Sequence, residues 1–330
     1  MKLFVKLSKN IAGFCKQKVI FVVMQEFSLK SSVDALELAV AVMEPEGPAK
    51  GIFQISHGMC EHKERYYPFM AWMASHGYVC VINDHRGHGA SVKSEADLGF
   101  MYEGGWRALV EDLKTVGDWA RSQYPGLPFT LFGHSMGSLA VRSYTKRYDA
   151  TIDRLIVCGS PSDNPAKGIG RMLAAGIGLV RGSHHRPMIM QKMSFGTFNK
   201  PFEGETSATG RHYHSAWVCS NKEILDAYHK DPLCQFIFTS NGFKNLMGMM
   251  QDCYSSKGWS LRNTGIPVHF ISGAEDPCRT SDKAFRNAVQ AMKKLGYSCT
   301  DGRLYPGMRH EILNETGQMT VWNDILSMMD

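Results

Sequence analysis

Residues 129–138 read FTLFGHSMGS, and this stretch decides the fold. Its first four residues are typical of a short buried strand, and the apolar residues of 139–144 then recur at helical spacing. Between them, Ser135 stands in a G-x-S-x-G pattern with Gly133 and Gly137. A strand, this pattern and a helix make a nucleophile elbow, a sharp turn that lifts a serine hydroxyl above the sheet edge. We expect Ser135 to be a nucleophile; the alternative is a glycine-rich turn with an idle serine.

A serine nucleophile needs a base and an orienting acid, and after an elbow of this type they follow as Asp or Glu, then His. The strand-like run 266–271 ends in a loop with Glu275 and Asp276, at the strand end where open α/β sheets keep their sites. Asp276 is the preferred acid because Pro277 fixes the backbone after it and its side chain is shorter. Glu275 is the competitor. His310 comes later, in the required order, and is expected to exchange the serine's proton.

A fourth component is expected upstream of the elbow. The strand-like run 51–56 ends in His57, Gly58 and Met59, a turn of the kind that points its next backbone amide at an elbow serine. The N–H groups of Met59 and Met136 would form an oxyanion hole, in which one donor contributes about 3 kcal/mol in comparable hydrolases. His57 itself is interpreted as a structural histidine that bonds nearby loop backbone.

Five further blocks of sequence are informative when they are taken together. They are HGMCEH at 57–62 followed by Arg65 and Tyr66, DHRGHGAS at 84–91, YPGLP at 124–128, DPLC at 231–234 and RHEILNE at 309–315. With the elbow, they resemble monoacylglycerol lipases and bacterial lysophospholipases of the α/β-hydrolase superfamily, from about residue 27 to residue 315. The resemblance implies an α/β-hydrolase fold with a mostly parallel central sheet, helices on both faces and an inserted helical lid.

The resemblance also implies an activity and its residues. Ser135 would be the nucleophile, Asp276 the acid and His310 the base of a serine esterase that needs no cofactor. Met59 and Met136 would supply the oxyanion amides. The substrates would be carboxylic esters of single-chain lipids, monoacylglycerols or lysophospholipids, cleaved through an acyl-enzyme intermediate.

Other positions in the blocks carry smaller expectations. Asp84, Arg86 and His88 match a family block that shapes the loop after a strand, and we interpret them as structural. Ser138 stands where many relatives carry a second glycine, and Cys278 follows the acid loop. Both departures could adjust the pocket without changing the chemistry.

Two other functions stay open on the residues alone. The same elbow and triad serve amide and thioester cleavage, so a peptidase or thioesterase is the first alternative. The second is a non-catalytic protein that uses the pocket to bind a ligand, which an intact set of Ser135, Asp276 and His310 disfavours. Epoxide hydrolase or haloalkane dehalogenase chemistry would call for a carboxylate at the elbow position, which is serine here.

Composition limits the partners. The net charge is +6, with 37 basic residues spread among 31 acidic ones, so a nucleic-acid partner is not expected, although a weakly basic surface favours contact with anionic membrane faces. Nine cysteines without a C-x-x-C pair indicate reduced thiols in a cytoplasmic setting, with peripheral membrane contact at most. The pairs His184, His185 and His212, His214 lack neighbouring ligands, so we expect no metal site and place them on the lid surface.

The chain is expected to form one α/β core with an insertion. The core comprises residues 24–163 and 258–330, and the segment 164–257, irregular in hydropathy and rich in glycine, methionine and histidine, is the expected lid. Its methionines would either line an acyl-chain tunnel or fill gaps in the lid core; they are Met188, Met190, Met193, Met247, Met249 and Met250.

Residues 1–23 precede this core as an N-terminal extension. Residues 1–14 carry three lysines and no acid, with apolar residues at helical spacing, which favours a basic amphipathic helix that touches a membrane. A signal peptide is the rival, but the apolar run 19–24 is too short for its core. The third interpretation is that translation starts at Met24.

Overall fold

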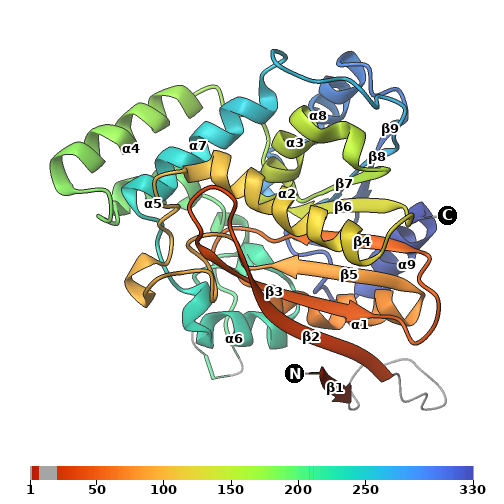
Figure 1. The fold of residues 1–330 in the computed structure, drawn as a ribbon. Helices are drawn as coiled ribbons and strands as arrows, with labels where there is room; N and C mark the ends of the chain where they lie inside the picture. The colour runs from red at the N-terminus through yellow and green to blue at the C-terminus, as the bar shows by residue number, and fades with distance from the viewer. Residues whose placement is uncertain (1, 7–20, 208, 211, 330) are drawn as a thin grey trace.

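A twisted sheet with helices on both faces forms the body of the molecule (Figure 1). The computed structural model describes residues 2–6, 21–207, 209–210 and 212–329. The strand order is β1-β2-β3-β5-β4-β6-β7-β8-β9. Neighbours from β5 to β9 in this order run parallel, and β1, β2 and β3 pair antiparallel, with β3 also antiparallel to β5. The strands are β1 Lys2–Lys6, β2 Phe21–Lys30, β3 Glu37–Glu44, β4 Gly51–Ser56, β5 Tyr78–Asn83, β6 Phe129–His134, β7 Arg154–Cys158, β8 Val268–Gly273 and β9 Thr300–Tyr305.

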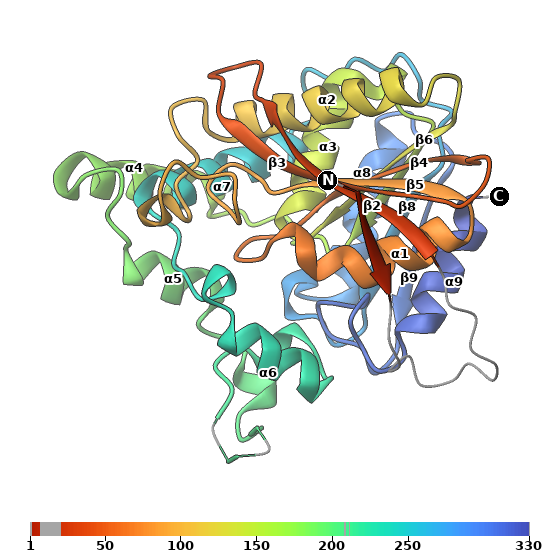
Figure 2. The ribbon, with the colours of Figure 1, turned by 60° about the horizontal axis from the view of Figure 1, so that its bottom comes forward.

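Helices shield both faces of the sheet, as Figure 2 shows for α2 and α3 on one side and α1 and α9 on the other. The first face buries apolar side chains of α2, α3, α7 and α8, and the second buries those of α1 and α9. Strands β4 and β6 are buried along their whole length because both of their faces are covered. The helices are α1 Tyr67–Ser75, α2 Gly105–Gln123, α3 Met136–Tyr148, α4 Lys167–Arg181, α5 Met188–Phe195, α6 Lys222–Lys230, α7 Ser240–Tyr254, α8 Asp282–Lys294 and α9 Gln318–Met329.

The parallel register brings the predicted site residues to one edge. Ser56, at the end of β4, lies opposite Gly133 of β6, and Gly273, at the end of β8, lies opposite Tyr305 of β9. The loops that follow these four strands therefore leave the sheet at its carboxyl edge, where sheets of this kind bind ligands.

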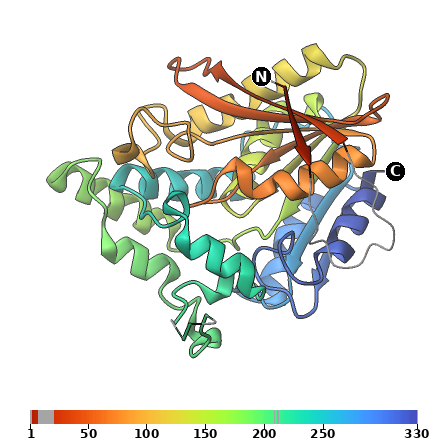
Figure 3. The ribbon, with the colours of Figure 1, turned by 90° about the horizontal axis from the view of Figure 1, so that it is seen from below.

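The segment between β7 and β8 forms a helical insertion with α4, α5, α6 and α7, which extends from one side of the sheet (Figures 1 and 3). Helix α7 packs on α2 and α3, and α4 packs on α7. Met247, Met249 and Met250 of α7 are buried, and Met249 and Met250 lie in the same apolar cluster as α2 and α3. Met188 and Met193 of α5 are exposed. Met249 and Met250 thus fill space in the core.

The predicted N-terminal helix is wrong over residues 2–6. These residues form β1, in which Lys2 pairs with Gln25 and Lys6 with Phe21 of β2. The free edge of β2 offers unpaired backbone N–H and C=O groups, and the KLFVK sequence of β1 is rich in strand-forming residues, so pairing prevails over the helical spacing. The other apolar positions of that spacing, Leu7, Ile11 and Phe14, lie outside the described residues.

Two further observations concern the whole described part of the chain. No helix in it combines the length and the apolar character that a bilayer-spanning segment needs. The eight cysteines it contains are all free thiols, and only Cys299 is exposed.

Candidate active site

Ser135 occupies the turn between β6 and α3 in a strained conformation. Its φ of 53° and ψ of −119° lie in a region that residues with a side chain rarely adopt. The turn is fixed by the Ser135 N–H, which donates to the Cys158 carbonyl at 3.0 Å, and by Ser138, whose N–H donates to the Ser135 carbonyl at 2.9 Å. Such strain persists only where the surroundings impose it, as they do here between two packed strands and a helix.

The elbow glycines are required by close approach of other backbone. A Cβ on Gly133 would lie 2.4 Å from the Gly137 carbonyl oxygen. A Cβ on Gly137 would lie 2.0 Å from the Ser56 carbonyl oxygen at the end of β4. Neither neighbour can move without displacing helix α3 or the end of β4, so both positions accept only glycine.

Asp276 and His310 lie together at the same edge. Asp276 Oδ2 is 2.9 Å from His310 Nδ1, and the carboxylate also accepts from the Cys278 N–H at 2.8 Å and the Ser272 hydroxyl at 3.1 Å. Burial raises the pKa of Asp276, but the charge and hydrogen bond of His310 outweigh it, so this pKa is below its ordinary value. Glu275, the competitor, is exposed.

The structure does not bring Ser135 and His310 into a hydrogen bond. Within the described residues, the hydroxyl of Ser135 has no hydrogen-bond partner, and the recorded polar neighbour of His310 Nε2 is Cys278 Sγ at 4.0 Å. The ring of His134, the residue before Ser135, lies 4.7 Å from the His310 ring. The hydrogen bond between a catalytic nucleophile and its base is often long in a substrate-free enzyme and shortens in the complex.

The turn at residues 57–59, which we call the oxyanion loop for its predicted role, lies against the elbow. A Cβ on Gly58 would be 3.0 Å from Ser135 Cβ, so the loop passes directly beside the serine. The N–H groups of Met59 and Met136 donate to no other group among the described residues. His57 bonds loop backbone, as its interpretation required: its Nε2 accepts from the His85 N–H at 2.9 Å and its Nδ1 donates to the Gly58 carbonyl at 2.8 Å.

A buried ionic network beneath this loop was not recognised from the sequence. Glu61 accepts hydrogen bonds from the Gly58 N–H, the Tyr66 hydroxyl at 3.0 Å and His134 Nδ1 at 3.0 Å. Burial lowers the pKa of His134, but its hydrogen bond to Glu61 and the charge of Glu61 outweigh burial and raise it. Burial raises the pKa of Glu61, but the hydrogen bond to His134 and the charge of His134 outweigh burial, so the pKa of Glu61 lies below its ordinary value. The pair is therefore an ion pair.

Arg65 connects this network to the loop that carries His310. It forms a bidentate pair with Glu311, at 2.5 and 2.7 Å, and a further contact with Glu61 at 3.2 Å. The network thus joins the oxyanion loop, the elbow and residues 309–315, which we call the base loop because His310 is the predicted base. The sequence feature that belongs to this network is the run HGMCEH with Arg65, which contributes to the family resemblance but from which no role for Glu61 or Arg65 was predicted.

The residues interpreted as structural support the loop after β5. Asp84 accepts from the N–H groups of Lys63 at 2.7 Å and Ala90 at 2.9 Å. Arg86 is fully buried and pairs with Asp112 at 2.7 Å.

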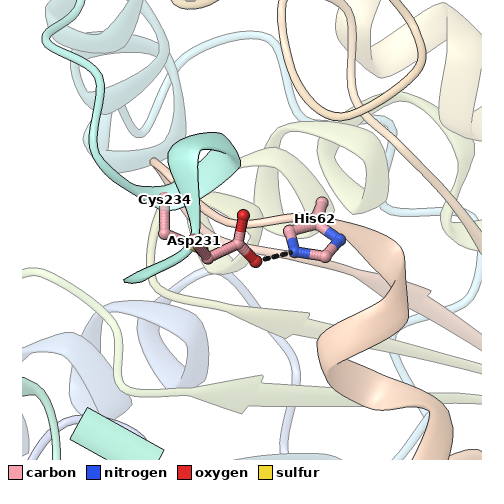
Figure 4. Close-up of side chains that lie close together, drawn as sticks. All are labelled: His62, Asp231 and Cys234. Atoms are coloured by element: carbon pink, nitrogen blue, oxygen red, sulfur yellow. Dashed lines mark hydrogen bonds and ion pairs between the residues drawn. The ribbon is translucent and has the colours of Figure 1, made fainter. Parts of the chain in front are cut away.

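The insertion meets the oxyanion loop through His62, Asp231 and Cys234 (Figure 4). His62 Nε2 lies 2.8 Å from Asp231 Oδ2, and the ligand-type atoms of all three residues lie within 4.8 Å of one another. Any cation at this place would have to separate the directly bonded pair. The second such group among the described residues is Asp276, Cys278 and His310, which contains the predicted acid and base.

The histidines expected on the surface of the insertion lie there only in part. His184 is exposed, with its ring stacked on Phe100 at 3.8 Å and its Nε2 3.1 Å from Asp97. His185 is half-buried, and His212 and His214 are exposed.

Comparison with known proteins identifies the family. The family model described as serine aminopeptidase, S33, matches residues 47–317. The chain belongs to this family. It is similar to a monoacylglycerol lipase of Mycolicibacterium smegmatis, at 25% identity over 90% of this chain and 94% of the relative. A monoglyceride lipase of Mus musculus is 30% identical over 88% of this chain and 84% of the relative.

A solved structure shares the fold. The carboxyl esterase from Bacillus coagulans, crystallised with glycerol, superposes with a TM-score of 0.80 at 23% identity and covers 93% of this chain and 99% of its own. The expectation of an α/β-hydrolase that resembles monoacylglycerol lipases is therefore confirmed, and so is the expectation of a carboxylic ester hydrolase.

Proposed function

We propose that this hydrolase cleaves carboxylic esters of single-chain lipids with Ser135 as nucleophile, His310 as base and Asp276 as orienting acid. The observation that carries the proposal is the strained Ser135 at the β6–α3 elbow, at the same sheet edge as the 2.9 Å contact between His310 and Asp276. A serine held in this conformation presents its hydroxyl above the sheet, and a histidine fixed through Nδ1 keeps Nε2 available for the proton.

Two half-reactions follow. Ser135 Oγ attacks the ester carbonyl carbon while His310 Nε2 takes the hydroxyl proton, and the alcohol leaves with that proton, so the acyl group remains on the serine. Water then attacks the acyl-enzyme, His310 accepts a proton from it and returns it to Ser135, and the fatty acid leaves. In both steps Asp276 holds the imidazole ring and stabilises its charged form.

The negative oxygen of each tetrahedral intermediate would lie between the N–H groups of Met59 and Met136. Support comes from the absence of any other acceptor for these two groups in the described residues and from the closeness of the Gly58 turn to the serine. Each donor would contribute about 3 kcal/mol to the barrier reduction.

The substrate class is proposed from the relatives and from one surface. The relatives are named monoacylglycerol or monoglyceride lipases. The insertion, which we propose to be the lid, carries six lysines and arginines and no acid between residues 164 and 202. Most of the exposed large apolar side chains of the described residues lie on its helices α4 and α5: Ile169, Met172, Leu179, Val180, Met188, Ile189 and Met193.

A surface that is both cationic and apolar suits contact with an anionic lipid interface. Such contact would place the protein at the periphery of a membrane while its core stays in water. Single-chain esters would then enter from the interface on the side of α4 and α5, and lysophospholipids remain the alternative to monoacylglycerols.

A second candidate function is aminopeptidase activity, which the family description favours. An aminopeptidase must bind a substrate ammonium, usually through a free carboxylate. The buried carboxylates near the elbow, Glu61 and Glu311, are already paired with His134 and Arg65. The esterase proposal therefore has the better support, and a thioesterase remains compatible with the same residues.

Fluorophosphonate labelling, measured by intact mass, tests the nucleophile. The folded wild-type chain should gain one label and Ser135→Ala none, whereas an unlabelled folded wild type would favour a ligand-binding protein. Rates on monoacylglycerols, lysophospholipids, acyl thioesters and aminoacyl arylamides, with Ser135→Ala as blank, then test the substrate. A clear preference for arylamides would refute the lipid-ester proposal.

A further inference from the structure

The loop that carries His310 lies directly against one part of the insertion. Segment 216–221 of the insertion lies beside residues 309–315 and makes several polar contacts with them. The Glu311 N–H donates to the Val218 carbonyl at 2.8 Å, and the Arg309 guanidinium donates to the Ala216 carbonyl at 2.7 Å. This contact joins two regions that are about 90 residues apart in the chain.

Glu315 occupies the centre of this contact. Its side chain is buried, with 1% of the residue exposed. One carboxylate oxygen accepts from the Arg309 N–H at 2.9 Å and from the Ser220 N–H at 3.0 Å, and the other accepts from the Ser220 hydroxyl. One charged group therefore binds the residue directly before His310 and the insertion at the same time.

Three consecutive backbone positions around the base are anchored in this way. The Arg309 N–H is held by Glu315, the His310 carbonyl lies 3.2 Å from His134 Nε2, and the Glu311 N–H is held by Val218. Only the middle anchor comes from the elbow. The Glu311 anchor comes from the insertion, and the Arg309 anchor comes from Glu315, which Ser220 of the insertion holds in turn. The Trp217 ring of the insertion also lies 5.0 Å from the His310 ring.

We propose that Glu315 is a positioning residue for His310: its carboxylate fastens the base loop to segment 216–221, so that the insertion determines where the base stands. The inference rests on the proposed role of His310. Catalytic geometry is sensitive to such placement, because a displacement of about 1 Å can lower a rate on the order of a hundredfold. The insertion thus has a part in the chemistry besides any part in substrate entry.

Glu315→Gln and Ser220→Ala test this proposal, with Asp149→Asn as matched control. Asp149 is equally buried and also accepts from a serine hydroxyl, that of Ser260, and from a backbone N–H, that of Asn263. It follows the far end of α3 from Ser135, about 20 Å away along the helix. Both carboxylates should therefore contribute to stability, but only Glu315 to turnover.

For Glu315→Gln, kcat on a soluble short-chain ester should fall about 10–100-fold with KM within about twofold. Ser220→Ala should lower kcat about fivefold. The double variant should be no slower than Glu315→Gln alone, because the two substitutions weaken the same contact between Glu315 and Ser220. Asp149→Asn should keep wild-type kcat at a similar loss of thermal midpoint.

The proton shared by His310 Nδ1 and Asp276 gives a second measurement by NMR. Its downfield resonance should move or broaden in Glu315→Gln and stay unchanged in Asp149→Asn. The proposal is overturned if folded Glu315→Gln keeps kcat within twofold of wild type. If Glu315→Gln does not fold, wild-type kcat in Ser220→Ala overturns it instead. Ser135→Ala and His310→Ala separate the two hypotheses, because activity in either would refute the proposed function and not only this inference.

Discussion

Replacing Glu61 with Gln should weaken both the fold and the catalysis, and the loss should depend on pH. The substitution keeps the size of the side chain and removes its charge. The amide oxygen can still accept from the Gly58 N–H and the Tyr66 hydroxyl, but the ion pair with His134 is lost. Arg65 keeps its bidentate pair with Glu311.

The magnitude follows from these contacts. Removing one partner of a buried ion pair costs about 3–5 kcal/mol, and the retained hydrogen bonds place Glu61→Gln near the lower limit, about 3 kcal/mol. The Gly58 turn also becomes less firmly held, so the neighbouring Met59 amide shifts. Loss of an oxyanion donor costs about 100-fold or more in kcat, so a displaced donor should cost about 10–100-fold.

The sign of the pH dependence follows from the two pKa directions. The pKa of His134 is raised above its ordinary 6.5, so its contribution is fully present below pH 6.5 and is lost as pH rises through the raised value. The pKa of Glu61 is lowered below its ordinary 4.5, so its contribution is fully present above pH 4.5 and is lost as pH falls through the lowered value. The pair therefore stabilises most between pH 4.5 and 6.5.

Urea unfolding of wild type and Glu61→Gln at pH 5.5 and at pH 8.5 measures this difference. The gap in unfolding free energy should be about 3 kcal/mol at pH 5.5 and smaller at pH 8.5. A gap that is equal at the two pH values, or that grows with pH, would refute the ion-pair assignment. Steady-state kinetics with a soluble ester, at a pH where both proteins are folded, gives the change in kcat.

Three further predictions concern the acid, the elbow and the surface of the insertion. Asp276→Asn should lower kcat about 10⁴-fold, because the asparagine would hold His310 in the wrong tautomer. Steady-state kinetics measures this loss, and calorimetry should show an unfolding temperature similar to that of the wild type. Gly137→Ala should destabilise by more than about 3 kcal/mol or prevent folding, because its Cβ would lie 2.0 Å from a carbonyl oxygen of β4. Its matched control, Gly176→Ala in α4, meets nothing within 4 Å and should be neutral or stabilising by about 0.5–1 kcal/mol, as urea unfolding would show. Replacing Leu179 and Val180 together with Ser should weaken sedimentation with anionic vesicles by about tenfold or more and leave turnover of a soluble ester unchanged; equal vesicle binding would contradict the docking surface.

The elbow could be predicted because its signal is local. A strand ending, a turn that admits only glycine and a helical period are all contained in about 16 residues, and the strained φ of Ser135 is the conformation such a turn imposes. The order of Asp276 and His310 could be predicted because parallel strands deliver their following loops to one edge. Asp276 was preferred over Glu275 on the sequence alone, from Pro277 and side-chain length, and the structure agrees with that preference because Asp276 is buried against the histidine while Glu275 is exposed.

Other features could not be predicted because they depend on contacts between distant segments. Glu61 and His134 are 73 residues apart, and Arg65 and Glu311 are 246 apart, and no local pattern indicates either pairing. At the N-terminus, a local pattern was present but misleading. The apolar residues have helical spacing, but residues 2–6 pair with the edge of β2 and form a strand.

The sequence by itself was enough to indicate the α/β-hydrolase family and to predict an order of nucleophile, acid and base, because glycine requirements and strand and helix periods act over a few neighbouring residues. Only the tertiary structure decided how those residues are held. The carboxylates of Glu61 and Glu315 join the oxyanion loop to the elbow and the base loop to the insertion across long chain separations, and the mutual contact of Glu61 and His134 favours their charged forms against the effect of burial. Such contacts form because packing removes water from the charged groups, which can then pair only with one another.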